Sequence, residues 1–408
     1  NIRAFIIIGF TRIHAEIKMS NTFERRNFIK LGLGAFGGAM ASAFPNFAFA
    51  NADTDTRFLF VIQRGAADGL DSVIPYADPA YARARGALAI SESEAIKLNG
   101  TFALHPSLVN IGELYKSGQA AMVHAIASPY RERSHFDGQN IMESCGLRAY
   151  EIDSGWLNRF LTLLAIGRNS RKDPIALSAT IPMALRGTNP VTSYAPSNIP
   201  ASDNDYMSSI GQLYETDAQL YALWMQATAT REMAAGENNR QNAGSMGRLA
   251  ASFLVRDDGP RIAMVESNGW DTHQGQKNRL ENGLRGLDAE IATFKAGMGD
   301  KWAKTIVLIA TEFGRTIATN GTIGTDHGTG SVAYVLGGKV NGGRVIADWP
   351  GLANAQLYEG RDLKPTADLY GLIAGVLGEG FGFEPQLVSR TLFPALPISR
   401  ALGGLVRV

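Results

Sequence analysis

Five short apolar runs, rich in β-branched residues, constrain the fold of this chain most strongly. They occupy residues 58–62 (FLFVI), 120–126 (AAMVHAI), 261–266 (RIAMVE), 305–310 (TIVLIA) and 331–336 (SVAYVL). Each run is largely continuous rather than alternating in polarity, which is typical of strands that are buried on both faces of a parallel or mixed sheet. The sequence therefore predicts a central sheet that is covered on both sides.

Helical patterns separate these runs. The clearest is a four-three spacing of apolar residues that makes one stripe, at Leu280, Leu284, Leu287, Ile291 and Phe294. A second helix is predicted after Thr366 as its N-cap, and shorter ones at 108–115 and 156–164. Strands that alternate with helices predict a doubly wound α/β/α sandwich with a mostly parallel central sheet.

The first fifty residues have the layout of an export signal. Arg25 and Arg26 precede a Gly- and Ala-rich apolar stretch that closes on Ala48-Phe49-Ala50, a small-x-small cleavage pattern. We expect a twin-arginine (Tat) signal peptide at 19–50, an upstream read-through at 1–18, and a periplasmic or otherwise extracytoplasmic domain at 51–408. An uncleaved anchor or an amphipathic first helix is the alternative.

Composition excludes several classes of partner. Residues 1–50 hold six of the 39 basic and two of the 38 acidic residues, so 33 basic and 36 acidic residues remain after cleavage. A mildly acidic chain without a basic run argues against nucleic acid as a partner. No later segment is apolar for the roughly 20 residues that a membrane span needs. The single cysteine, Cys145, cannot form an internal disulfide.

Ionisable residues follow the predicted strands, where open α/β sheets bind their ligands. They are Asp68 and Asp71; Arg131, Arg133, Ser134, His135 and Asp137; Asp271 and His273; Glu312 and Arg315; and, before the last strand, Asp326 and His327. Carboxylates and imidazoles that converge from separate loops can hold a divalent metal without cysteine. Ser134 begins a predicted helix and could attack a bound anion, which Arg131 and Arg133 could clamp. Each residue also has a structural interpretation: Asp68 could cap a turn and Ser134 a helix.

A polar stretch interrupts the strand-helix alternation. Residues 186–205 are dense in Pro, Ser, Asn and Asp, a helical stretch follows at 206–233, and 236–245 is polar again. We expect a loop and helical insertion at about 186–245, which could cover a site.

Taken together, these segments resemble an exported bacterial family, domain of unknown function 1501, within the alkaline phosphatase and sulfatase superfamily. The segments that carry the resemblance are the twin-arginine leader, RGAADGLDSVIPYADPAYARAR, FALHPSL, SPYRERSHFDGQ, GWLNR, NGWDTHQG, ATEFGRT, NGTIGTDHGTGSVAYVLGG and KPTADLYG. The resemblance implies an alkaline-phosphatase-like α/β sandwich that holds metal at its strand ends and hydrolyses phosphate or sulfate esters.

By position, the resemblance implies metal roles for Asp68, Asp271, His273 and His327 and the nucleophile's role for Ser134. From their placement at strand ends, we add Glu312 and Asp326 as candidate metal or acid-base residues and His135 and Arg133 as candidate catalytic residues. The superfamily commonly has Asp-His-Gly where this chain has Glu312-Phe313-Gly314. Because Phe313 cannot bind metal, we expect one ion (Zn, Mn, Ca or Mg) rather than two; a site that keeps the fold and holds none is the alternative.

Two hypotheses follow. The first is a metal-dependent hydrolase of an anionic small-molecule or glycan ester. The second is a non-catalytic exported protein that binds a ligand or another exported protein through the same cleft.

Overall fold

The computed structural model describes residues 55–164, 173–196, 204–234, 244–396 and 401–407. The predicted read-through segment and Tat signal lie outside these residues. Within them, no helix is long and apolar enough to cross a membrane.

A central sheet organises the described residues, in the order β11-β5-β10-β9-β1-β8-β6-β7, with β12 also pairing with β5. Its strands are β1 (Arg57–Arg64), β5 (Ala120–Ala127), β6 (Ile175–Leu177), β7 (Thr192–Ser193), β8 (Ile262–Asn268), β9 (Thr305–Thr311), β10 (Ser331–Leu336), β11 (Arg344–Ile346) and β12 (Ala367–Asp368). All neighbours pair in parallel except that β10 runs antiparallel to both β5 and β9. The five predicted strands and the mostly parallel sheet are confirmed.

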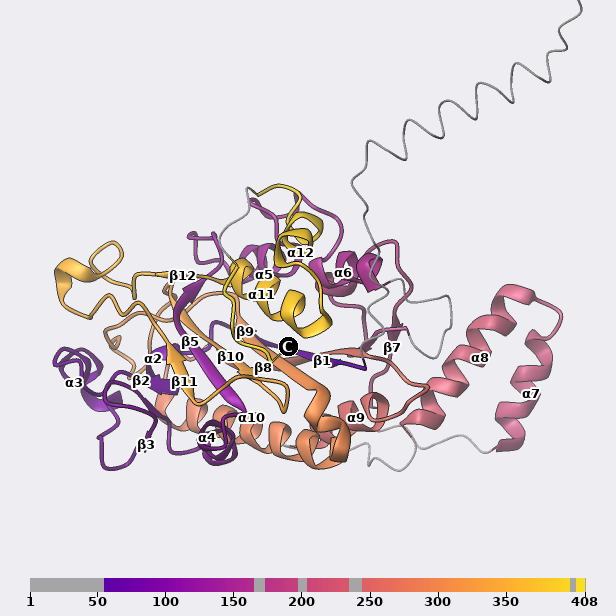
Figure 1. Ribbon diagram of the computed structural model, residues 1–408, viewed down its shortest axis with the longest axis horizontal. Helices are drawn as coiled ribbons and strands as arrows, with labels where there is room; N and C mark the ends of the chain where they lie inside the picture. The colour runs from indigo at the N-terminus through magenta and orange to yellow at the C-terminus, as the bar shows by residue number, and fades with distance from the viewer. Residues whose placement is uncertain (1–54, 165–172, 197–203, 235–243, 397–400, 408) are drawn as a thin grey trace, which may run out of the picture. The chain divides into compact units, whose positions relative to one another are not determined.

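Helices cover both faces of this sheet, as Figure 1 shows. One face carries α5 (His135–Ser144), α6 (Trp156–Leu164), α11 (Leu369–Phe381) and α12 (Pro385–Leu392), and the other carries α4 (Val109–Lys116), α9 (Ser245–Leu254) and α10 (Gln276–Met298). Strand β1 shows why both faces need cover: Phe58 and Phe60 point into one apolar core, and Leu59 and Val61 into the other. The α/β/α sandwich is confirmed.

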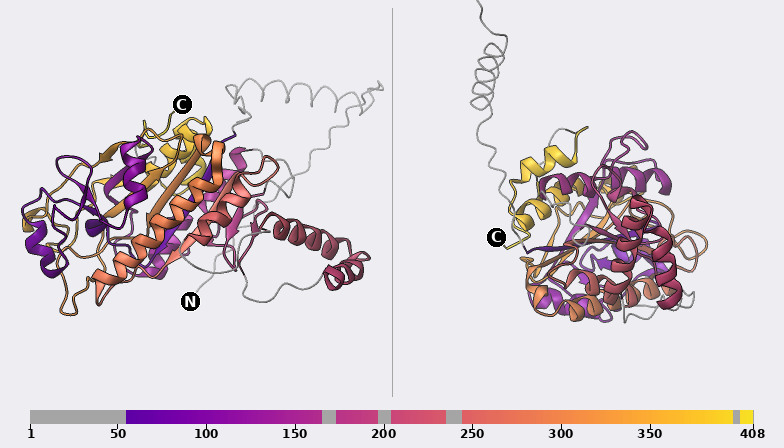
Figure 2. Two further views of the ribbon diagram at one scale, coloured as in Figure 1. Left: turned by 90° about the horizontal axis from the view of Figure 1, so that it is seen from below. Right: turned by 90° about the vertical axis from the view of Figure 1, so that its right-hand side faces the viewer.

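The predicted apolar stripe forms the buried side of α10. Leu280, Leu284, Leu287, Ile291 and Phe294 are all buried. Figure 2 shows α10 lying along the sheet beside α9. The Thr293 hydroxyl joins the two helices by donating to the carbonyl of Gly244, 2.7 Å away.

Smaller elements complete the description. A second sheet has the order β2-β4-β3, with β2 (Val73–Ile74), β3 (Ile96–Lys97) and β4 (Ala103–Leu104), and the short helices α2 (Gly69–Ser72) and α3 (Tyr81–Arg85) lie near it in sequence. Within the predicted insertion, α7 (Asn204–Tyr214) and α8 (Ala218–Met233) pack on each other.

One predicted cap is wrong. Thr366 does not begin α11, because its main-chain N–H donates to the carbonyl of Ala125 as the chain enters β12. Asp368 caps the helix instead, and its carboxylate accepts from the N–H of Tyr370 at 3.0 Å.

Candidate metal centre

The candidate site lies at the edge of the sheet where several strands end. His135 begins α5 after β5, Asp271 and His273 follow β8, and Arg315 follows β9. His327 precedes β10. Because β10 is antiparallel to its neighbours, its first residues lie at the same edge as the last residues of the parallel strands.

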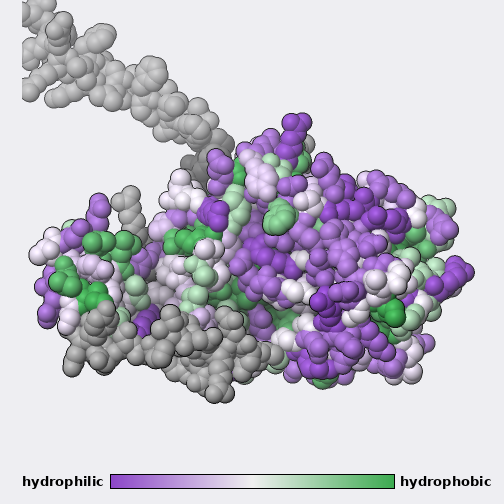
Figure 3. Space-filling model, turned by 180° about the vertical axis from the view of Figure 1, so that it is seen from behind, coloured by the Kyte–Doolittle hydropathy of each residue, from purple (hydrophilic) through white to green (hydrophobic). Residues whose placement is uncertain are grey.

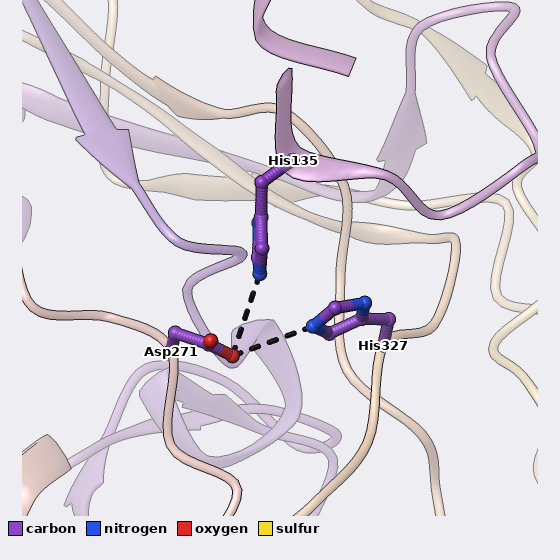
Figure 4. A group of neighbouring side chains, drawn as sticks. All are labelled: His135, Asp271 and His327. Carbon is purple, nitrogen blue, oxygen red and sulfur yellow. Dashed lines mark ion pairs between the residues drawn. The ribbon is translucent and has the colours of Figure 1, made fainter. Parts of the chain in front are cut away.

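Three imidazoles surround the carboxylate of Asp271. Its Oδ1 is 3.4 Å from Nε2 of His135, 3.1 Å from Nε2 of His273 and 3.4 Å from Nε2 of His327. Figure 4 shows His135 and His327 pointing at Asp271 from different segments of the chain. Single ligand atoms of these three residues lie within 4.8 Å of one another, as required for one ion to bind all three.

The Nδ1 atoms of all three rings face oxygen acceptors. His135 bonds Glu312 Oε1 at 2.9 Å, His273 bonds Asp326 Oδ1 at 3.1 Å, and His327 bonds the carbonyl oxygen of Arg133 at 2.8 Å. Because carboxylate and carbonyl oxygens only accept, each Nδ1 carries a proton. In the neutral rings, the three Nε2 lone pairs are therefore free to bind a cation.

The arrangement of the Nε2 atoms suits a cation at this point. Those of His273 and His327 are 2.9 Å apart, so two neutral rings would set their lone pairs face to face. The buried Nε2 of His135 lies 3.4 Å from Oδ1 of Asp271, in a geometry that makes no hydrogen bond. A proton shared by His273 and His327 relieves the first conflict, and a proton on Nε2 of His135 relieves the second. A metal ion relieves both at once, so the residues present fit a divalent metal.

Charges around the site keep Asp271 ionised. Burial acts to raise its pKa, but the hydrogen bond from Arg315 (2.7 Å) and the charge of that residue outweigh burial and lower the pKa below its usual range. Burial lowers the pKa of His327, and the neighbouring His135 lowers it further. A neutral imidazole and an ionised carboxylate are the forms that bind metal.

Glu312 lies behind His135 rather than facing the other metal-binding atoms. Its carboxylate is fully buried and accepts from the ring of His135, the amide of Gln139 and the N–H of Gly65. Burial acts to raise the pKa of Glu312, but these hydrogen bonds lower it overall. The bond to Glu312 in turn raises the pKa of His135. A carboxylate behind a histidine orients the ring and makes it a stronger ligand.

Asp68 is not brought into this cluster. It is 1% exposed, caps α2 through the N–H of Leu70, and forms a buried ion pair with Arg85. The amide of Gln276 also donates to it. Asp326 bonds His273 through its Oδ1, so it supports one imidazole of the cluster from behind.

The predicted catalytic residues at the start of α5 have structural contacts of their own. Ser134 caps α5, although the N–H of Asp137 is 3.5 Å from its hydroxyl. Arg133 pairs with Glu359 and Asp362, so carboxylates occupy its guanidinium. Its φ of 61° is in the left-handed region, and its carbonyl accepts from His327.

A network of buried polar side chains, which the sequence patterns did not predict, supports the site from within the protein. Gln276 Oε1 accepts from Thr325 at 2.5 Å, and the Thr325 hydroxyl accepts from Nε of Arg315 at 3.1 Å. Together with the bond from Gln276 to Asp68, this links Asp68 to Asp271 through buried side chains. The sequence identified Arg315 as an ionisable residue that follows a strand, but no motif indicated that it pairs with Thr325.

The sequence matches the family described as "Protein of unknown function (DUF1501)" over residues 55–392, which include every residue of the candidate site. The chain belongs to this family. Comparison with curated proteins finds no match.

Solved structures that align with this family member include three enzymes. The alkaline phosphatase from the Antarctic bacterium TAB5 aligns at 12% identity over 70% of this chain and 92% of that chain, with a TM-score of 0.36. The lipoteichoic acid synthase LtaP from Listeria monocytogenes aligns at 8% identity over 74% and 69%, with a TM-score of 0.37. BT1596, a 2-O GAG sulfatase, aligns at 8% identity over 81% and 71%, with a TM-score of 0.32. At these values no residue role is carried over.

Proposed function

We propose that this protein is an exported, metal-dependent hydrolase of phosphate or sulfate esters. One observation carries the proposal: the Nε2 atoms of His135, His273 and His327 lie around the carboxylate of Asp271, and all three Nδ1 atoms are committed to oxygen acceptors. The imidazole nitrogens of His135 and His327 and the carboxylate oxygen of Asp271, with His273 beside them, suit Zn²⁺ or Mn²⁺ better than Ca²⁺ or Mg²⁺.

A bound ion of this kind polarises an ester oxygen and lowers the pKa of a nucleophile. The residues of the chain supply the rest. Arg315 holds Asp271 ionised and in place. Ser134 is our candidate nucleophile, because its hydroxyl stands at the amino end of α5, which attracts an anion.

Metal analysis and activity assays of the purified mature protein test this proposal. We expect close to one equivalent of Zn or Mn per chain and turnover of aryl phosphate or aryl sulfate esters. His273→Ala should lose metal and activity. Because His273 is 42% exposed, this substitution leaves the cores intact. Ser134→Ala should keep metal and lose turnover.

Glu113→Gln is the matched control, since Glu113 is an exposed residue of α4 that pairs with Lys116. It should change neither metal content nor rate. Absence of copurifying metal, together with no hydrolysis of either ester class after metal is added back, would reject the hydrolase.

Export is a separate part of the proposal and rests on the leader. Replacing Arg25 and Arg26 by Lys should leave the precursor in the cytoplasm, because the Tat pathway requires the doublet. Cell fractionation measures this, and unchanged export of the double variant would contradict it.

A second candidate function, a non-catalytic protein that binds a partner, is favoured by α7 and α8. Leu213, Leu223 and Met225 are 74%, 61% and 51% exposed. Figure 3 shows hydrophobic groups gathered at the end that carries these helices. Large exposed apolar side chains that lie together mark interaction surfaces. If Leu223→Ser abolishes copurification of another exported protein while hydrolysis is absent throughout, this second function replaces the first.

A further inference from the structure

A large cavity lies beside the candidate metal centre, between β8, the end of β6 and one side of α10. Its volume is about 700 Å³, and its lining includes Glu266, Asn268, Trp270, Gly286 and Glu290. Cavities of this size are typical of sites for small organic ligands. The candidate metal centre does not use it.

The carboxyl group of Glu290 is the unusual feature of this cavity. The residue is 9% exposed, and among the described residues its Oε1 is buried without a hydrogen-bond partner. Burial alone raises its pKa to about 7. A buried acceptor without a donor is destabilising, so a carboxyl group kept in this state indicates a partner that the described part of the chain does not supply.

The charges of the cavity define what that partner is. Among the described residues that line it, none is Lys, Arg or His, whereas Glu266 and Glu290 are acidic. Glu266 is already bound to Arg64. Within the described lining, Glu290 has no cation beside it, so this end of the cavity repels an anion and favours a cationic group.

Two glycines of α10 keep the cavity open. A Cβ at Gly286 would meet no atom within 4 Å, so the space beside it is empty. A Cβ at Gly283 would lie 3.2 Å from the ring of Trp270, which also lines the cavity. Trp270 is followed directly by Asp271 in the sequence. From Gly283, which faces Trp270, Glu290 lies about 10 Å farther along α10 at 1.5 Å per residue.

We propose that this cavity binds the part of the substrate that carries a protonated amine, and that the ammonium group pairs with Glu290. The inference rests on the proposed function, because the ester end of the same molecule would lie at His135, Asp271 and His327. The substrate class is then a zwitterionic ester, with an anionic phosphate or sulfate and an amine separated by a spacer. An ammonium group supplies the donors that Glu290 lacks.

Direct binding tests this without turnover. Hexylamine and hexanol are matched in length and differ in charge, and calorimetry at about pH 8 keeps Glu290 largely ionised, since its pKa is about 7. We expect the wild-type protein to bind hexylamine more tightly than hexanol. Glu290→Gln should weaken hexylamine binding roughly tenfold to a hundredfold and leave hexanol binding unchanged.

A second pair of variants provides an independent test in case Glu290→Gln does not fold. Gly286→Leu places a large apolar side chain in the cavity one turn of α10 before Glu290 and leaves the carboxylate in place, so it should abolish hexylamine binding. Gly286→Ala adds one methyl group with no neighbour within 4 Å and should bind as the wild type does. Both substitutions replace glycine within a helix by a better helix former.

The outcomes separate this inference from the proposed function. Equal affinity for hexylamine and hexanol, or equal hexylamine binding by wild type and Glu290→Gln, overturns the amine site even if esters are hydrolysed. Hexylamine binding that depends on Glu290 and survives in His273→Ala supports the amine site even if no ester is turned over.

Discussion

The buried carboxyl group of Glu290 predicts a specific dependence of stability on pH. Its pKa rises from 4.5 to about 7 because burial disfavours the charged form. The folded protein thus holds this proton more tightly than the unfolded chain does. The resulting stabilisation is fully present below pH 4.5, is lost as the pH rises through about 7, and is absent above that.

The size of the effect follows from the two pKa values. At about 1.4 kcal/mol per pH unit, the rise from 4.5 to about 7 corresponds to about 3 kcal/mol of unfolding free energy. For a domain of this size, that is roughly 4 °C in Tm. Glu290→Gln keeps the shape of the side chain and cannot ionise. It should match the wild type at about pH 4.5 and be more stable by about 3 kcal/mol at about pH 8.

Urea unfolding of both proteins across this pH range measures the difference in their unfolding free energy. Titratable groups that the two proteins share contribute equally to both and do not affect this difference. Glu281→Gln is the matched control, because Glu281 lies on the same helix but is 39% exposed and pairs with Arg285. A plot of unfolding free energy against pH for Glu281→Gln should stay parallel to that of the wild type. If the curves of Glu290→Gln and the wild type are also parallel from pH 4.5 to 8, the carboxyl group is solvated or paired in solution and the reasoning is refuted.

Two further predictions concern the support of the site. Arg85→Met should destabilise the fold by about 3–5 kcal/mol in urea unfolding, because it leaves Asp68 and Asp71 buried without their cation; a loss below about 1 kcal/mol would contradict this. Glu312→Gln should weaken metal affinity about tenfold to a hundredfold in equilibrium dialysis, because a neutral amide polarises His135 less than a carboxylate does; an unchanged affinity would show that Glu312 does not act through His135.

The strands were predictable because burial on both faces leaves a local signature. Phe58, Leu59, Phe60 and Val61 all had to be apolar, since alternate residues enter different cores. The placement of His135 and His273 near the site followed from the rule that ligands lie at the carboxyl ends of strands. His327 reached the same edge for a reason that the sequence does not display, the antiparallel direction of β10.

The division of roles among the acidic residues was not predictable. Asp68 and Glu312 follow β1 and β9 as Asp271 follows β8, so their positions in the sequence look alike. What separates them is the partner. Arg85 reaches Asp68 from α3, and His135 reaches Glu312 from α5. Such pairings depend on how the loops pack in three dimensions, whereas spacing along the chain describes only the strand that each residue follows.

Phe313 shows how one residue type decides what kind of metal centre this edge can hold. Its ring stacks on His135, with centroids 5.1 Å apart and an interplanar angle of 21°, and lies 5.5 Å from the ring of His327. A Cβ at Gly138 would be 3.0 Å from the same ring, so Phe313 is held tightly from the side of α5. It is 3% exposed and offers no ligand atom. An apolar wall therefore stands beside the imidazoles and fixes the rings of His135 and His327 around Asp271.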